Sequence, residues 1–172
     1  MAADTGVSEN LAEISQGLYG TRPAPAPSRV LRGDAGRFRS GPSPDGSGRE
    51  YSVNYNAGLL EGPSRNRVVA HEIAHGIDEL AGRIDTSGLK GELQTVYHDL
   101  NNPNPSPTAK QWTPQAAGYK GSDVDREYIA EAVRAYMTDP NYMKTVAPNT
   151  AAAIRNAVNS NALSSLQNQD RK

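Results

Sequence analysis

The chain has 172 residues, with 18 lysines and arginines, 19 aspartates and glutamates, and no cysteine, so its formal net charge is −1. This balance gives no electrostatic footprint for nucleic acid, and we expect no nucleic-acid partner. Without cysteine, the chain has neither disulfides nor thiolate zinc ligands. No apolar run approaches the ~18–20 residues of a membrane span, and the first residues show no secretory signal pattern.

The first third of the chain shows weak secondary-structure signals. A helix is expected around Leu11 to Leu18, followed by irregular chain over 21–50 that is rich in proline and glycine, with a short strand at 29–32. Residues 51–55 read Tyr-Ser-Val-Asn-Tyr and alternate apolar with polar, which predicts a half-buried strand. A further strand is expected to start at Leu59.

A stronger signal begins at Ser64, which is a plausible N-cap of a helix that stops before Gly82. Apolar residues follow at helical spacing and predict one buried stripe. The members of this stripe are Val69, Ile73, Ile77 and Leu80.

Two more helices are predicted downstream, over residues 123–138 and 150–166. The first ends before Pro140, and the second follows Pro148. Between residues 86 and 121 the chain is polar, and no regular structure is expected over 101–108, where prolines and asparagines dominate.

The segment His71-Glu72-Ile-Ala-His75 carries the clearest chemical signal. Two histidines four residues apart on a helix lie on one face, one turn apart, and can share one zinc ion at ~2.0–2.1 Å. Glu72 then lies beside the metal, where a general base would take a proton from a water bound to it. The alternative is an amphipathic helix with two surface histidines.

A catalytic zinc needs a third protein ligand and an open position. Glu127 and Glu131 are four apart on the predicted second helix, so both lie on one face. We assign Glu127 to the metal and Glu131 to a hydrogen bond that fixes a ligand imidazole, although the two roles are interchangeable. The alternative is a pair of solvated glutamates with Arg126 and Arg134 nearby.

Three other residues are candidates for supporting roles. Asp78 lies on the histidine face and either orients a ligand or caps a neighbouring loop. His98 is the remaining histidine and favours a surface role over a ligand role. Tyr119 lies in a glycine-flanked loop before Glu127 and is a candidate stabiliser of the oxyanion, with Tyr97 and Tyr128 as weaker ones.

Three segments together resemble the catalytic domain of lethal factor-like zinc metalloproteases, to which secreted Pro-Pro endopeptidases are related. They are His71-Glu-Ile-Ala-His75-Gly-Ile-Asp78, Glu127-Tyr-Ile-Ala-Glu131 and Ala147-Pro-Asn-Thr. The resemblance implies an α+β, zincin-like fold and one Zn²⁺ per chain, held by His71, His75 and Glu127. It also implies Glu72 as the base, Tyr119 as the loop tyrosine, and 51–55 as the edge strand that pairs with an extended substrate.

The expected function is a zinc metalloendopeptidase acting on an extended protein or peptide substrate, exported as a toxin or effector as the resemblance implies, or otherwise cytoplasmic. We expect an irregular or mobile leader over 1–48 and a catalytic domain over 49–172. One alternative is a non-catalytic binding module whose zinc is closed by a fourth protein ligand, His98 or Asp78. Another is a hydrolase of non-peptide amides.

Overall fold

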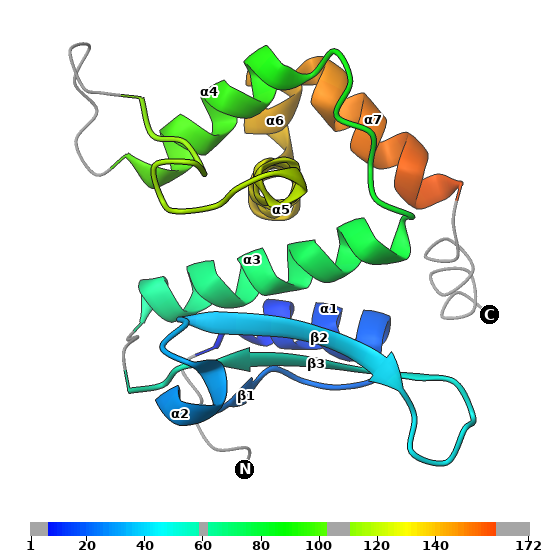
Figure 1. Cartoon of the computed structure of the whole chain (residues 1–172). Helices are drawn as coiled ribbons and strands as arrows, with labels where there is room; N and C mark the ends of the chain where they lie inside the picture. The colour runs from blue at the N-terminus through cyan, green and yellow to red at the C-terminus, as the bar shows by residue number, and fades with distance from the viewer. Residues whose placement is uncertain (1–6, 59–61, 103–110, 161–172) are drawn as a thin grey trace. The chain divides into compact units, whose positions relative to one another are not determined.

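The computed structural model describes residues 7–58, 62–102 and 111–160. These ranges form an α+β structure with seven helices and one three-stranded sheet, which confirms the expected class (Figure 1). The chain divides into two compact units, residues 1–76 and 77–172, and the division falls inside helix α3 (Pro63–Leu80).

The first unit contains the sheet, in the order β1-β3-β2. Strand β1 (Ala24–Pro25) is parallel to β3 (Arg49–Tyr55), and β2 (Gly36–Pro42) is antiparallel to β3. The predicted strand at 51–55 is confirmed, because Val53 and Tyr55 alternate with less buried residues and are each 1% exposed. Its implied edge position is wrong, since β3 lies between the other two strands and β2 lies at the edge.

Two helices accompany the sheet in the first unit (Figure 1). Helix α1 (Glu9–Tyr19) confirms the helix expected around Leu11 to Leu18 and ends at Gly20 in a left-handed conformation. Helix α2 (Ser28–Leu31) replaces the strand expected at 29–32, so that prediction is wrong. Pro27 has the fixed φ that suits a helix start, and its carbonyl accepts the N–H groups of Val30 and Leu31.

Strand β2 lies in the region expected to be irregular, residues 21–50. Two glycines and a proline make it a poor strand former, so pairing with β3 over the full register Gly36↔Tyr55 to Pro42↔Arg49 sets its conformation. The expected leader, 1–48, therefore contains α1, β1, α2 and β2 in its described part. The β2–β3 pairing crosses the expected boundary at 48/49. The strand expected from Leu59 begins outside the described residues.

Helix α3 confirms the predicted helix, but it begins at Pro63, so Ser64 lies inside the helix and its prediction as the N-cap is wrong. Its end confirms Gly82 as the stop: Gly82 has a φ of 79°, and the N–H of Arg83 donates to the carbonyl of Asp78 at 2.8 Å. These are the features of a Schellman motif. Within the predicted stripe, Val69, Ile73 and Ile77 are buried, whereas Leu80 is half-buried.

Gly76 allows an aromatic cluster to approach α3 closely. The Tyr19 hydroxyl donates to the carbonyl of Ile73 at 2.6 Å, and its ring lies 5.2 Å from that of Phe38, centroid to centroid. A Cβ atom at residue 76 would lie 2.7 Å from Cε2 of Phe38 and would also collide with the Tyr19 ring. A glycine inside a helix is unfavourable by about 1 kcal/mol relative to alanine, and here this contact explains its presence.

We expect Gly76→Ala to lower the free energy of unfolding by about 1–3 kcal/mol, because overpacking outweighs the gain in helix propensity. Urea unfolding followed by circular dichroism measures this effect. Gly17→Ala in α1 is the matched control, because a Cβ atom there meets nothing within 4 Å. Equal stability of the Gly76 variant and the wild type would contradict the close approach.

The second unit is helical: α4 (Lys90–Asn101), α5 (Ser122–Thr138), α6 (Pro140–Val146) and α7 (Pro148–Asn159). Helix α5 confirms the helix predicted over 123–138. Helix α7 confirms the start of the one predicted from 150 but ends at Asn159, and Leu166 lies outside the described residues. Helix α4 lies in the polar connection over 86–121, where no helix was predicted. Most of 101–108, where no regular structure was expected, lies outside the described ranges.

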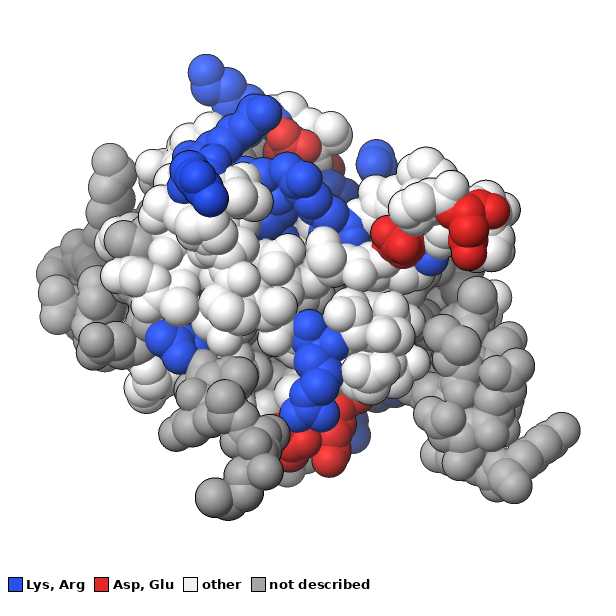
Figure 2. All heavy atoms as spheres, turned by 90° about the horizontal axis from the view of Figure 1, so that it is seen from below, with Lys and Arg blue, Asp and Glu red and all other residues white. Residues whose placement is uncertain are grey.

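Charge is unevenly distributed along the chain despite the overall balance. Residues 20–56 contain six arginines and three acidic residues. Figure 2 shows basic side chains at several places on the face that it presents, with fewer acidic ones. Within the described part of the chain, two of the six arginines form ion pairs, Arg22 with Glu9 and Arg37 with Asp34. The expectation of no nucleic-acid partner was drawn from the net charge of the whole chain, and it does not take this local excess of arginine into account.

None of the helices in the described ranges has the length and apolar character needed to cross a bilayer.

Candidate metal centre

The two histidines of the motif project from successive turns of α3. Their ring centroids lie 4.6 Å apart and the rings are nearly perpendicular, at 87°. Both residues are half-buried, whereas Val69 and Ile73 on the opposite face are fully buried. The helix is therefore anchored through one face and presents two imidazoles on the other, as the spacing predicts.

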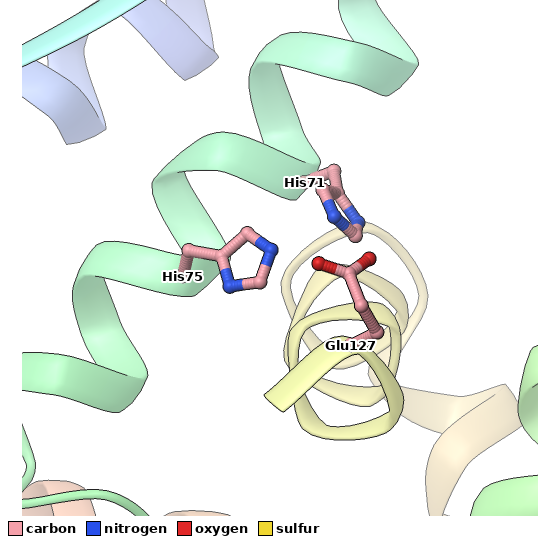
Figure 3. A group of neighbouring side chains, drawn as sticks. All are labelled: His71, His75 and Glu127. Atoms are coloured by element: carbon pink, nitrogen blue, oxygen red, sulfur yellow. The ribbon is translucent and has the colours of Figure 1, made fainter. Parts of the chain in front are cut away.

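Glu127 of α5 completes a three-residue group with His71 and His75. Each residue offers one ligand atom, and these atoms all lie within 4.8 Å of one another. Figure 3 shows both imidazoles turned toward the Glu127 carboxylate. A tetrahedral zinc ion holds its ligands about 3.3 Å apart, so small side-chain rotations would bring this group onto one ion. Two imidazoles and a carboxylate also form a donor set that zinc accepts.

The structure brings Glu127 into this group and gives Glu131 a different environment. Oε2 of Glu131 accepts hydrogen bonds from Nε and Nη2 of Arg134, at 2.9 and 2.6 Å. Glu127 is 7% exposed and Glu131 5% exposed, so neither is a solvated glutamate. Because Arg134 neutralises Glu131, a second carboxylate can be buried on the same helix at lower cost. The bond from Glu131 to a ligand imidazole stays a prediction.

Arg134 is a residue that the sequence interpretation did not assign to the site. Its spacing of three residues from Glu131 is the available signal, because side chains at i and i+3 are neighbours on a helix. That signal identifies the pair but not its burial, which depends on the surrounding helices.

Asp78 is 2% exposed and holds the chain after α3 to α5. Its two oxygens accept hydrogen bonds from Nη1 of Arg126 at 2.8 and 2.7 Å, and Oδ1 also accepts the N–H of Ile84 at 2.8 Å. Arg126 in turn donates to the Ile84 carbonyl at 2.9 Å. Of the two roles predicted for Asp78, these bonds match the capping of a neighbouring loop. Because Arg126 directly precedes Glu127, they also help to fix the start of α5.

Glu72, the predicted base, is half-buried on α3 beside His71. Its side chain passes close to the start of β2, because a Cβ atom at Gly36 would lie 3.1 Å from Cγ of Glu72 and would collide with Val68. The absence of a side chain at residue 36 therefore leaves room for Glu72 beside the edge strand.

Tyr97 lies in the electrostatic neighbourhood of Glu127, and Tyr119 lies in that of Tyr97. Tyr97 of α4 is 6% exposed and packs edge to face on Tyr128, with centroids 5.5 Å apart. Burial raises the pKa of Tyr97, and the nearby carboxylates of Glu131 and Glu127 raise it further, so its hydroxyl stays protonated. Tyr119 is 39% exposed and follows a turn in which its N–H donates to the Pro114 carbonyl.

His98 lies on α4 and is not a member of the three-residue group. Its Nδ1 accepts the N–H of Trp112 at 3.0 Å, and its Nε2 lies 3.3 Å from the side-chain nitrogen of Asn102. Both ring nitrogens thus have partners close in sequence or in the following loop, and the residue is half-buried, so it has a structural role rather than the surface role that was predicted.

The chemistry available to the group follows from its donors. Two imidazoles and one carboxylate can hold a divalent cation with a coordination position left for solvent or substrate, and Glu72 provides a further carboxylate on the helix of the two histidines.

Comparison of the chain with protein-family models, with curated proteins and with solved structures finds no match.

Proposed function

We propose that the chain is a zinc-dependent metalloendopeptidase with a zincin-like, lethal factor-like catalytic domain. The observation that carries the proposal is the group His71, His75 and Glu127, with their ligand atoms within 4.8 Å of one another and with Glu72 adjacent to His71. Three protein ligands and a neighbouring carboxylate are the elements that metal-assisted peptide hydrolysis requires.

The protein residues have distinct tasks in this proposal. When bound, zinc supplies Lewis acidity, which makes water a better nucleophile and polarises a carbonyl. Glu72 accepts the proton from the attacking water and returns it to the nitrogen of the leaving amine. The Tyr119 hydroxyl, which is exposed and precedes the Glu127 helix, donates a hydrogen bond to the developing oxyanion.

An extended substrate would pair with β2 in this proposal. The family resemblance points to an edge strand, and in the described sheet β2 has an unpaired side whereas β3 does not. The first residue of β2, Gly36, lies next to the side chain of Glu72, so a peptide along this edge starts beside the proposed base. Action outside the producing cell, as a toxin or effector, follows from the same resemblance.

The alternative of a non-catalytic zinc module has less support. It needs a fourth protein ligand, and neither of the two candidates belongs to the described three-residue group. Asp78 uses both oxygens on Arg126 and Ile84, and the ring of His98 is bonded through Nδ1 to Trp112. An incomplete protein shell favours an open coordination position and therefore an enzyme.

The test uses the full chain loaded with zinc and a mixed library of peptides, with products sequenced by mass spectrometry. We expect new peptide termini that disappear when a chelator removes the metal and return when zinc is restored. Elemental analysis provides an independent measurement, and one zinc per chain is expected. A chain that holds one zinc and leaves every peptide intact would overturn the proposal.

A further inference from the structure

A cavity of about 770 Å³ lies wholly within the second unit. It is bordered by the start of α4, the first turns of α5 and the two loops that precede these helices. Its size is within the usual range for ligand sites. Tyr119 belongs to its lining, and Val124 and Tyr128 line it from the helix that carries Glu127.

The inner part of the cavity is apolar. Leu93 is 2% exposed and Tyr128 is 4% exposed, and Val124 completes this surface. Binding of an apolar side chain against such a surface is favourable, because it removes apolar area from water. The inner part therefore suits an aliphatic or aromatic group.

The rim of the cavity is predominantly basic. Lys90 and Lys120 line it from two different segments, and both are exposed. Within the described ranges neither ammonium group has a hydrogen bond or ion pair. Asp125 contributes the one opposing charge of the lining. The N-terminal end of α4 also lies here, where the helix dipole is positive and is opposed by Glu92 in the first turn.

We propose that this cavity is a specificity pocket that selects peptide substrates with an acidic residue next to an apolar one. The apolar side chain lies on Leu93, Val124 and Tyr128, and the carboxylate reaches Lys90 and Lys120 at the rim. This inference rests on the proposed peptidase function and adds the class of substrate. Because Tyr119 is shared by the pocket and the proposed oxyanion site, the selected residues lie close to the scissile bond.

The experiment compares the cleavage profiles of the zinc-loaded wild type and the double variant Lys90→Glu, Lys120→Glu on one peptide library. Lys144→Glu is the matched control, since Lys144 is an exposed lysine of α6 that does not line the cavity. A peptide that the wild type cleaves is then synthesised with its acidic residue replaced by lysine, and kcat/KM is measured for both peptides. Zinc content and circular dichroism verify that each variant is folded.

We expect the wild type and Lys144→Glu to favour the acidic peptide at least tenfold, and the double glutamate variant to favour the lysine peptide. The milder pair Lys90→Gln, Lys120→Gln should abolish the preference without reversing it. Salt at 0.5 M should reduce the preference, because screening weakens exposed charges.

Each contrary result identifies what fails. Cleavage by the wild type with no charge preference overturns the pocket assignment and leaves the peptidase proposal intact. A preference that survives in the double glutamate variant overturns the role of the two lysines. Failure of the zinc-loaded wild type to cleave any peptide overturns the peptidase proposal, and the pocket's role in selection with it.

Discussion

Replacement of Glu72 by glutamine is expected to reduce peptide hydrolysis by about 10²–10⁴-fold while the chain still binds one zinc ion. Glutamine has nearly the same shape as glutamate but cannot accept a proton, so the loss isolates the proton-transfer role. Because Glu72 is not a member of the metal-binding group, zinc content should not change. Steady-state kinetics and elemental analysis on the same preparation measure both quantities.

The control for this variant is Glu79→Gln, the same chemical change at an exposed position of the same helix. It should retain wild-type activity. Activity of Glu72→Gln within tenfold of the wild type would refute the assignment of the base. Loss of zinc together with activity would instead mean that Glu72 supports the metal.

The second large effect is expected at His71. His71→Ala should lower the zinc content from one ion per chain to none, because two remaining ligands hold zinc weakly. Zinc at about 100 times its dissociation constant stabilises a folded chain by roughly 2.7 kcal/mol, so it should raise the melting temperature of the wild type. The variant should show no such rise. Elemental analysis and thermal unfolding with and without zinc measure these effects.

His98→Ala is the matched control, since His98 lies outside the three-residue group. It should keep one zinc ion, even if the lost bond to Trp112 reduces stability. The pair Glu127→Gln and Glu131→Gln distinguishes the two carboxylates: the first should lose zinc, and the second should retain it. Full zinc occupancy in His71→Ala would contradict the ligand assignment.

The elements that could be predicted from sequence are those whose pattern lies within one segment. Helix α3 has a regular apolar stripe and a glycine stop, and β3 has a clear alternation. Helix α4 was missed because its buried residues, Leu93, Val96 and Tyr97, stand among polar neighbours just before a proline-rich segment. Strand β2 was missed because its conformation comes from pairing with β3 rather than from its own residues.

The candidate site shows the same division. The spacing of His71 and His75 fixes two donors on one helix face, and the need for a third ligand led to Glu127. The choice between Glu127 and Glu131 could not be made from sequence, because both lie on one face of α5. The partners Arg126 for Asp78 and Arg134 for Glu131 depend on how helices and loops pack in three dimensions.

The edge position of β2 also bears on how the chain behaves at high concentration. An open strand edge offers unpaired peptide groups to other copies and is a route to aggregation. In β2 the ends carry Gly36 and Pro42, and Arg37 and Arg39 place positive charge along the strand. Stacking two such edges would bring like charges together and would meet a residue without an N–H group. These features of β2 therefore oppose its polymerisation with other copies of the chain.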